Sequence, residues 1–370
     1  MLDNMTYWIE NADSALLLPT LPAASVDALV TDPPAGIGFM GKEWDDFRRA
    51  RNPADAGRDS VHGRLSRSGP EYGRRDRDHF IAWLAGILRE CCRVMKPGAY
   101  GWVWAIPRTS HWTAMACEDA GFAVRDVMTH IQSQVFPKSR SLLKPAAEHW
   151  ILIKAPGELR ELRIEENRIG SVGLHSVTQG RGSHGVDGWG MGRSTYDVKP
   201  GGRWPANFAL SHSDDCEAEC VEDCPVRPLD EQSLANGMHS AGVARVYETD
   251  RETEGATSIL SGTSVRKQER KGDSGGASRF FYVAKASTKE RSAGLPERNS
   301  HPTVKSIALM RHLIRLIAAP GSLILDPFTG SGSTAVAALQ EGCRFAGIER
   351  DPQHAETARL RAQHALSQVT

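Results

Sequence analysis

The feature that most constrains the fold of this chain is a glycine-rich turn between an apolar strand and a helix. The turn is the segment Leu325-Asp326-Pro327-Phe328-Thr329-Gly330-Ser331-Gly332-Ser333-Thr334. Glycines in such a turn let backbone amides approach a ligand at the N-terminus of the helix. A second acid, Glu349, ends the next strand 17 residues after Gly332, where a carboxylate can bind both hydroxyls of a ribose. The pattern predicts an open α/β sheet that binds a nucleoside at the carboxyl ends of its strands.

The same turn indicates which nucleoside binds. No lysine follows the glycines to hold a phosphate, which disfavours ATP and NAD. Asp326 can instead accept hydrogen bonds from a cationic amine. We therefore predict that the cofactor is S-adenosylmethionine, a nucleoside that carries an ammonium group.

A second motif follows another apolar strand. It is the segment Val30-Thr31-Asp32-Pro33-Pro34-Ala35-Gly36. Consecutive prolines fix φ and remove backbone donors, so the nearby carbonyls point outward as acceptors. The Asp32 carboxylate and the Pro33 carbonyl suit the two N–H bonds of an exocyclic amine, and hydrogen bonds of this kind localise the nitrogen lone pair by electrostatic preorganisation. Alone, this motif is more typical of an ordinary turn; together with the glycine-rich turn and Glu349 it indicates a site for an amine nucleophile.

Strand and helix patterns alternate around both motifs. Strands are expected at 27–30, 100–106, 122–131, 150–154, 322–325 and 344–348. Helices are expected at 80–95, 110–120, 304–317 and 334–340, and from 352 onward. This alternation predicts an α/β fold with a mostly parallel sheet covered by helices.

Residues 156–298 differ in composition from the rest. They hold 19 of the 35 glycines, few apolar runs, an acidic run at 214–231 and a basic run at 266–271. We interpret this stretch as an inserted, loop-rich module. It divides the chain into a catalytic half at 1–155, the module at 156–298 and a cofactor-binding half at 299–370.

Residues 48–78 form a second anomaly, with nine arginines and five acids and hence a charge of +4. Both a solvated surface loop and a mobile arm that contacts phosphates are compatible with this composition. The position of the segment just after the Asp-Pro-Pro turn favours the arm.

The overall composition excludes several classes of protein. The 45 Lys and Arg residues balance 45 Asp and Glu residues, which argues against a protein that coats nucleic acid indiscriminately. Segregation of the charged runs still allows contact with nucleic acid on one face. No apolar run approaches the ~20 residues of a membrane span, no signal sequence is visible, and the seven cysteines do not form a disulfide framework. We therefore expect a cytoplasmic protein with no membrane partner.

Taken together, the motifs resemble those of the beta class of amino-group DNA methyltransferases, in which the catalytic motif precedes the cofactor motif. The resemblance covers residues 1–155 and 276–370. The matching segments are 11–13, 21–22 and 25–27 for the adenine contact, 31–34 for the Asp-Pro-Pro-Tyr motif, 301–305 for the pre-cofactor segment, 326–332 for the cofactor loop and Glu349 for the ribose-binding acid. Segments 202–207 and 230–233 resemble parts of long phage and bacterial members.

The resemblance implies a Rossmann-like sheet of seven strands and methyl transfer from S-adenosylmethionine to N6 of adenine or N4 of cytosine in double-stranded DNA. Asp in the position of Asp32 goes more often with adenine. The module at 156–298 would be the target-recognition module, and the protein would associate with the nucleoid. A homodimer and a cognate restriction nuclease are left open.

The resemblance also assigns residues to the site. The catalytic residues would be Asp32, Pro33, Pro34 and Ala35. The cofactor-binding residues would be Asp13, Lys305, Asp326, Phe328, Thr329, Gly330, Gly332 and Glu349. Candidate phosphate contacts, each with a solvated surface charge as the plainer alternative, are Arg48, Arg49, Arg51, Lys138, Lys144, Arg203, Arg266, Lys267, Arg270 and Lys271.

One position departs from the family pattern. Ala35 stands where the family carries an aromatic residue that stacks on the flipped-out target base, a contact worth roughly 1 to 3 kcal/mol. The chain is an enzyme silenced by an engineered substitution, a natural pseudoenzyme that binds DNA and cofactor, or an enzyme in which Phe39 or Trp44 stacks instead. We favour the first, because the flanking residues 36–41 still resemble an active member.

His212, Cys216, Cys220 and Cys224 fall at four-residue intervals. Three thiols and an imidazole can bind one zinc ion if the segment is a loop. On a helix the outer two residues would lie about 18 Å apart, too far for one ion. Free cysteines in an acidic surface segment are the plainer interpretation, so we expect no metal.

Several other functions are compatible with the same acceptors. Cytosine N4, an RNA base and a protein glutamine amide all present a planar amine, and the long module favours DNA among these substrates. A catalytically silent regulator that binds DNA and cofactor is the alternative from another class.

Overall fold

The computed structural model places the chain in two compact units. The first comprises Met1–Asn167, Pro205–Arg227 and Phe281–Thr370, and the second Arg168–Trp204 and Pro228–Phe280. The structure describes residues 5–37, 45, 74–132, 143, 146–169, 202–213, 216, 219–222, 224–235, 243–249, 263–269, 276–284, 288–299, 301 and 304–369. The unit boundaries differ from the expected module, because 205–227 and 281–298 belong to the first unit.

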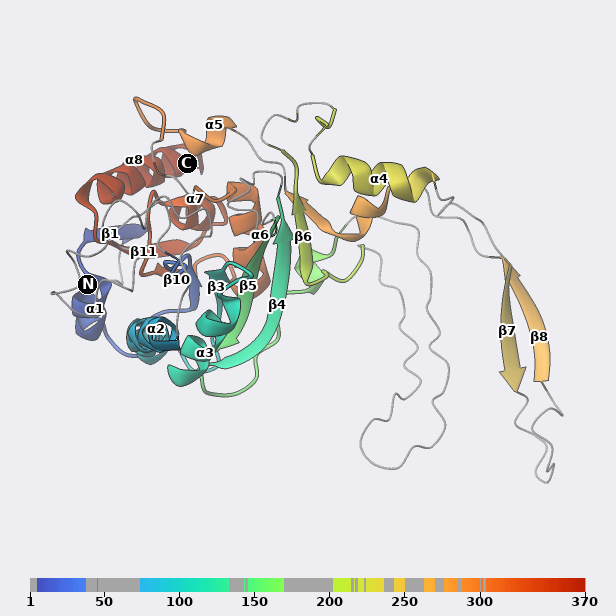
Figure 1. Cartoon of the computed structure of the whole chain (residues 1–370), viewed down its shortest axis with the longest axis horizontal. Helices are drawn as coiled ribbons and strands as arrows, with labels where there is room; N and C mark the ends of the chain where they lie inside the picture. The colour runs from blue at the N-terminus through green and yellow to red at the C-terminus, as the bar shows by residue number, and fades with distance from the viewer. Residues whose placement is uncertain are drawn as a thin grey trace, which may run out of the picture. The chain divides into compact units, whose positions relative to one another are not determined.

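A single sheet forms the centre of the first unit (Figure 1). Among the described residues it has nine strands, in the order β1 (Tyr7–Asn11), β11 (Arg344–Glu349), β10 (Leu323–Asp326), β2 (Ala28–Thr31), β3 (Tyr100–Ala105), β5 (Ala147–Lys154), β4 (Ala123–Ile131), β6 (Phe208–Ser211) and β9 (Tyr282–Ala284). The expectation of seven strands was wrong. The last two, β6 and β9, extend the sheet beyond β4 and come from segments that the glycine-rich composition had assigned to the module.

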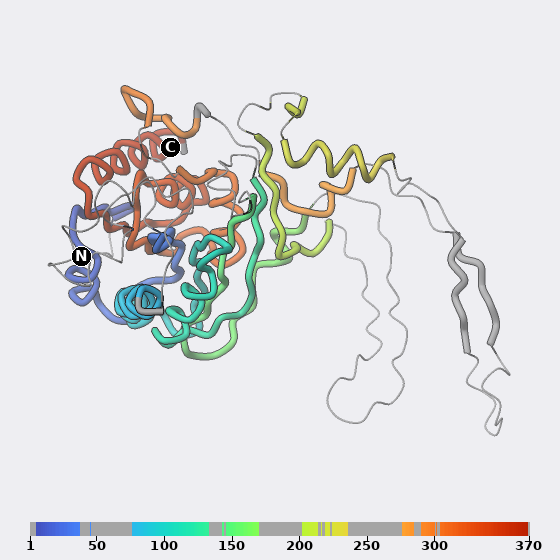
Figure 2. The backbone as a smooth tube through the Cα atoms, viewed as in Figure 1, coloured from blue at the N-terminus to red at the C-terminus, as the bar shows by residue number. Residues whose placement is uncertain are grey.

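The strands that carry the two motifs are neighbours in the sheet. Strand β2 pairs with β10, and β10 pairs with β11, all in parallel register. Strand β1 adds in parallel beyond β11, with Asn11 opposite Glu349. Figure 2 shows these blue and red ends of the chain side by side. Within this nine-stranded sheet only the pairs that β5 makes with β3 and β4 are antiparallel among the described residues, so the expected mostly parallel sheet is confirmed.

Two helical layers cover this sheet (Figure 1). Helices α2 (Arg74–Val94) and α3 (Ser110–Asp119) pack on one face, together with the short α1 (Ser14–Leu17) and η1 (Leu18–Thr20). Helices α6 (Ile307–Ile317), α7 (Ser333–Gln340) and α8 (Pro352–Val369) cover the other face. Successive strand residues point to opposite faces, so Leu29 lies in the first core cluster while Ala28 and Val30 lie in the second.

The remaining elements are short. In the first unit they are η6 (Glu165–Asn167) and α5 (Thr288–Arg291). Helix α4 (Val226–Ala235) begins in the first unit and continues into the second, which also contains η7 (Ala277–Phe280) and the antiparallel hairpin of β7 (Val243–Thr249) and β8 (Thr263–Glu269). Within the described residues, no helix is both long and apolar enough to cross a membrane.

Side-chain hydrogen bonds hold α4 to η7 inside the second unit. The Asp230 carboxylate accepts hydrogen bonds from the backbone N–H of Ser278 at 2.8 Å and from its hydroxyl at 2.7 Å. The Ser233 hydroxyl accepts another from the N–H of Ala277 at 2.8 Å. These contacts give the 230–233 segment a structural role.

The arginine-rich segment at 48–78 lies mostly outside the described residues. Its last part, 74–78, forms the first turn of α2. The helix was expected to begin at residue 80 but begins at Arg74. The last five residues of the expected arm therefore belong to α2.

Candidate active site

Asp326 joins the two motifs at the carboxyl edge of the sheet. Its carboxylate accepts hydrogen bonds from the Thr31 hydroxyl at 2.8 Å, from the Phe328 N–H at 3.0 Å and from the Thr334 hydroxyl at 2.6 Å. Thr31 lies 295 residues away in the sequence. Because Asp326 is only 1% exposed and both oxygens are engaged, its observed contacts are with the protein rather than with the cationic amine that the sequence suggested. It positions the glycine-rich turn against the end of β2.

The glycine-rich turn requires its glycines. Gly330 and Gly332 have φ values of 53° and 82°, a left-handed conformation that L side chains rarely adopt. A Cβ atom on Gly332 would lie 2.9 Å from the Ala358 Cα in α8. The turn therefore packs directly on α8 and keeps its backbone close to the edge of the sheet.

Glu349 lies beside this turn, as predicted. Its carboxylate accepts hydrogen bonds from the N–H groups of Gly330 and Asp351, both at 2.8 Å. Asp13 lies at the end of neighbouring β1, where it caps α1 by accepting from the Ala15 N–H at 2.8 Å. The edge thus presents two partly exposed carboxylates at the ends of the adjacent strands β1 and β11, a set of acceptors that suits the hydroxyls and amine of a nucleoside.

Arg361, on α8, hydrogen-bonds to the glycine-rich turn. It was not identified from the sequence. Its Nη1 atom donates to the Ser331 carbonyl at 2.6 Å and to the Ser331 hydroxyl at 3.2 Å. Burial lowers the pKa of this guanidinium to about 10. A signal was available, because Arg361 interrupts a buried face of α8 that otherwise carries Ala355, Ala358, Ala362 and Ala365.

The Asp-Pro-Pro motif contributes Asp32 to a cluster of charged residues. Lys305 places its Nζ atom 3.3 Å from an Asp32 carboxylate oxygen and 3.3 Å from a Glu148 carboxylate oxygen. The same ammonium lies 3.7 Å from the centroid of the Trp104 ring, a cation–π contact. Lys305 was expected to bind the cofactor, but the contacts that the structure gives it belong to the Asp32 cluster.

Glu148 and His130 complete this cluster from the adjacent strands β5 and β4. His130 lies 3.3 Å from a Glu148 oxygen through Nδ1 and 2.8 Å from the Ser211 hydroxyl through Nε2. Burial alone would raise the pKa of Glu148, but Lys305 and His130 hold it well below its usual range. Sequence reasoning did not single out these residues. A glutamate at the start of an otherwise buried strand was the signal that could have found them.

Two carboxyl groups with raised pKa values therefore lie at adjacent strand ends. Burial raises the pKa of Asp32 to about 6, although Lys305 opposes the shift. Burial also raises the pKa of Asp326 to about 7, against the hydrogen bonds from Thr334 and Thr31. The Asp32 side chain remains 21% exposed. Of the two, Asp32 is the carboxylate that a substrate can reach.

The backbone around Ala35 is held in place from both sides. The Thr109 hydroxyl donates to the Ala35 carbonyl at 2.9 Å. Gly36 has a φ of 72°, and a Cβ atom there would lie 2.6 Å from the Phe80 ring. The Asp45 carboxylate accepts hydrogen bonds from the N–H groups of Gly36 at 2.6 Å and Ile37 at 3.2 Å. The fixed backbone gives position 35 a defined direction, while Phe39 and Trp44 lie outside the described residues.

The other expected site residues are placed as follows. The Phe328 ring packs 5.8 Å from the Trp83 ring, centroid to centroid, and Thr329 donates from its hydroxyl to the Asp326 carbonyl at 2.9 Å. Arg203 lies in the second unit, with its guanidinium 4.4 Å from the Phe280 ring centroid. Arg266 and Lys267 belong to β8. The remaining candidate phosphate contacts lie outside the described residues, namely Arg48, Arg49, Arg51, Lys138, Lys144, Arg270 and Lys271.

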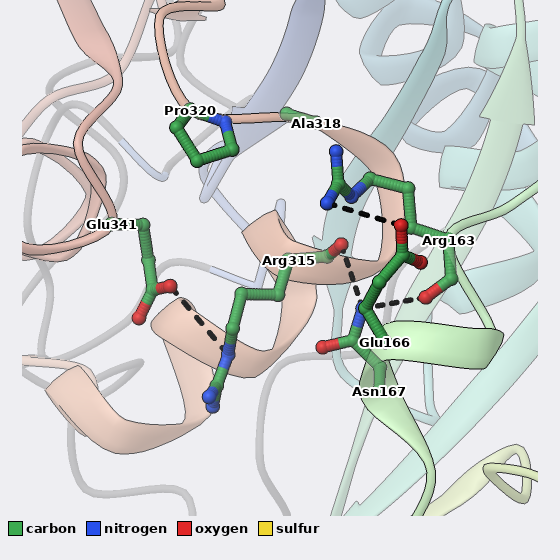
Figure 3. A pocket seen from close by; sticks show the side chains of 7 residues that line it. All are labelled: Arg163, Glu166, Asn167, Arg315, Ala318, Pro320 and Glu341. Atoms are coloured by element: carbon green, nitrogen blue, oxygen red, sulfur yellow. Dashed lines mark hydrogen bonds and ion pairs between the residues drawn. The ribbon is translucent and has the colours of Figure 1, made fainter.

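A surface pocket elsewhere in the first unit does not contribute to this site. It is lined by Arg163, Glu166, Asn167, Arg315, Ala318, Pro320 and Glu341 (Figure 3). Its charged side chains point toward one another, with Arg163 3.3 Å from Glu166 and Arg315 3.8 Å from Glu341. Ala318 and Pro320 precede β10, so the pocket lies near the amino end of that strand, away from Asp32 and Glu349.

Comparisons with known proteins identify the family of the chain. A family model described as DNA methylase, for enzymes of the N6 and N4 type, matches residues 26–360. The chain is 23% identical to the type II methyltransferase M.HindIII of Haemophilus influenzae over 353 residues, 93% of this chain and 91% of that protein. It is 44% identical over 71 residues to YubD of Escherichia coli (strain K12), named as a methylase, and the match spans 18% of this chain and 31% of that protein.

A solved structure shares the fold. The cytosine-N4-specific PvuII DNA methyltransferase is 13% identical, with a TM-score of 0.51 over 96% of this chain and 86% of that one. The predicted α/β methyltransferase fold is confirmed. So is the predicted cofactor, because S-adenosylmethionine is the methyl donor of this family. The match to the family model covers most of the chain, and the protein belongs to the N6/N4 family of DNA methylases.

Proposed function

We propose that the protein is a site-specific methyltransferase that acts on N6 of adenine in double-stranded DNA, and that Ala35 impairs its activity. The observation that carries the proposal is the placement of Asp32, a partly exposed carboxylate beside the cofactor turn. The identity of Asp32 supports adenine, since the family uses Asp at this position more often for adenine than for cytosine. Cytosine N4, the target named for the PvuII enzyme, is the second candidate.

Asp32 and Pro33 act on the target amine. The Asp32 carboxylate and the Pro33 carbonyl accept its two N–H bonds, which draws the nitrogen lone pair out of conjugation with the ring. S-adenosylmethionine supplies an electrophilic methyl group when it is bound. Lys305 holds Asp32 in position at 3.3 Å. The Lys305 ammonium also pairs with Glu148, so its positive charge is shared between the two carboxylates rather than directed at Asp32 only.

The residues proposed to hold the cofactor come from three neighbouring strand ends. Glu349 would accept the ribose hydroxyls, the backbone of 328–332 would follow the methionine part, and Asp13 would approach the adenine. Asp326 and Arg361 hold the glycine-rich turn in place through hydrogen bonds to its backbone. This assignment uses Asp326 as a positioning residue rather than a direct ligand.

The DNA partner must present its base to a site at the sheet edge. An exocyclic amine inside a duplex is out of reach, so we expect the target base to flip out of the stack. The second unit is proposed as the target-recognition module, with Arg266 and Lys267 on β8 and Arg203 as phosphate contacts. A homodimer and a cognate restriction nuclease remain expectations from the family resemblance.

The product nucleoside tests the assignment directly. Genomic DNA from cells that express the chain or its Ala35→Tyr variant is digested and analysed by mass spectrometry. We expect N6-methyldeoxyadenosine at one sequence context, with more of it from the variant. N4-methylcytosine would replace the adenine assignment. A lack of both products, combined with sequence-specific DNA binding, would favour the silent regulator.

We further propose that the sulfonium of bound S-adenosylmethionine lies near Asp32 and Asp326, and the pH dependence of cofactor binding tests this. Asp32 and Asp326 have pKa values of about 6 and about 7, so both gain protons as the pH falls below neutrality. A cationic sulfonium near these carboxylates favours their ionised forms, and its affinity should decrease as they protonate. We expect affinity for S-adenosylmethionine to fall at least tenfold from about pH 8 to about pH 5.

S-adenosylhomocysteine is the matched control for this measurement, because it keeps the ammonium and the ribose and lacks the methyl group and, with it, the sulfonium charge. Titration calorimetry at several pH values should show a clearly weaker pH dependence for it. Equal pH dependence for the two ligands would place the sulfonium away from both carboxylates.

A further inference from the structure

Four metal-ligating side chains converge at the end of β6. His212, Cys216, Cys220 and Cys224 place their ligand atoms within 4.8 Å of one another. The described residues from 212 to 224 belong to neither a helix nor a strand. This is the loop conformation that the sequence required for a zinc site, and it removes the geometric objection to one ion.

The distances fit a tetrahedral ion. Zinc binds thiolate sulfur at about 2.3 Å and imidazole nitrogen at about 2.0 to 2.1 Å, so tetrahedral angles place sulfur and nitrogen about 3.6 Å apart. The His212 Nδ1 atom lies 3.3 Å from the Cys220 sulfur and 3.6 Å from the Cys224 sulfur. The ligands thus already lie near the positions that a bound ion would impose.

The composition of the cluster identifies the ion and its role. Three thiolates and one imidazole form one of the usual structural zinc sets, which fills all four positions and leaves none for a substrate. Cys224 is fully buried and Cys216 is 7% exposed. Cys220 and His212 are partly buried. A divalent ion with affinity for thiolate and imidazole would stabilise the convergence of these four side chains.

We propose that His212 Nδ1 and the sulfurs of Cys216, Cys220 and Cys224 bind one structural Zn²⁺ ion. The backbone N–H of His212 donates to the Ala284 carbonyl at the end of β9, at 3.0 Å, while Cys224 lies two residues before α4. The ion therefore ties the outer strands β6 and β9 to the start of α4. It holds the chain at the point where it leaves the first unit for the second.

Metal analysis of the purified full-length protein, prepared under reducing conditions without added metal, tests the proposal. We expect about one zinc per chain by plasma mass spectrometry, and less than roughly a tenth of an equivalent would end it. X-ray absorption should give about three sulfurs at about 2.3 Å and one nitrogen at about 2.0 to 2.1 Å. A zinc ion with only nitrogen and oxygen ligands would also contradict the proposal.

Variants locate the ion. Cys220→Ser, which changes a partly exposed ligand, should lose most of the zinc and release the remainder to a weak chelator. Cys92→Ser is the matched control, because Cys92 is a partly buried free thiol on α2 outside the cluster, and it should keep the full equivalent. Equal zinc contents in the two variants would overturn the assignment.

Cobalt substitution of the unmodified chain gives a second measurement that does not depend on how the variants fold. Tetrahedral Co²⁺ with thiolate ligands should show strong visible bands and thiolate charge transfer. A disulfide within the cluster is the competing structure. Thiol titration after unfolding should find all seven cysteines, and a count of five would support the disulfide and reject the metal.

Discussion

Ala35→Tyr is expected to raise the rate of DNA methylation at least tenfold. A base stacked on an aromatic side chain gains roughly 1 to 3 kcal/mol, and each ~1.4 kcal/mol corresponds to a factor of ten. The new ring would start from a backbone that the Thr109 and Asp45 hydrogen bonds already fix. The rate of tritium or deuterium transfer from labelled S-adenosylmethionine into duplex DNA is the measurement.

Two further substitutions separate stacking from simple bulk. Ala35→Phe keeps the aromatic face and should recover most of the gain, whereas Ala35→Leu adds apolar volume without a π system and should recover little. Affinity for the cofactor should not change in any of the three, because position 35 follows β2 rather than the glycine-rich turn. Robust turnover by the chain with Ala35, with no increase in Ala35→Tyr, would show that the missing aromatic residue does not impair the enzyme.

Asp32→Asn, made in the Ala35→Tyr chain so that turnover is measurable, is expected to lower the methylation rate by about 10² to 10³. The amide keeps the size of the carboxylate but loses its charge, and its NH₂ group repels the N–H bonds that the carboxylate would accept. Single-turnover kinetics with saturating DNA and cofactor isolate this step. The cofactor dissociation constant should change much less than the rate.

Asp27→Asn is the matched control at the other end of the same strand. Asp27 directly precedes β2, at the opposite edge from Asp32, where it pairs with Lys96 at 2.6 Å and accepts from the Leu323 N–H at 2.9 Å. Its substitution should lower thermal stability somewhat and leave the methyl-transfer step unchanged. Comparable rates for Asp32→Asn and its parent would show that another acceptor carries the chemistry.

The motifs and the central strands were predictable because local sequence determines them. Strands β2 and β10 are apolar runs, each followed by prolines or glycines that end a strand. Both strands were expected within one or two residues of their observed bounds. Helix α6 was expected from 304 but begins at Ile307, where Ser306 caps it by accepting from the Leu309 N–H. Helix starts depend on such single hydrogen bonds more than on periodicity.

The rest of the site depends on long-range contacts that no local pattern encodes. Lys305 reaches Glu148 across 157 positions in the sequence, and Glu148 meets His130 only because β4 and β5 pair in one register. Strands β6 and β9 contain four and three residues, too few for a recognisable alternation within a glycine-rich region. Their place in the sheet is set by the pairing of β6 with β4 and of β9 with β6, not by their own sequence.

The contact between β1 and α8 has a consequence for how such enzymes can vary. The Arg359 guanidinium donates to the Ile9 carbonyl at 3.1 Å, and β1 pairs with β11 along its length, so the first strand and the last helix are neighbours in space. A circularly permuted chain, in which a short linker joins α8 to β1 and the termini lie elsewhere, would form the same sheet. In such a chain β10 and its glycine-rich turn could precede β2 in the sequence. The order of the two motifs in the sequence therefore depends on where the chain termini lie, and the arrangement of side chains at the carboxyl ends of the strands does not depend on it.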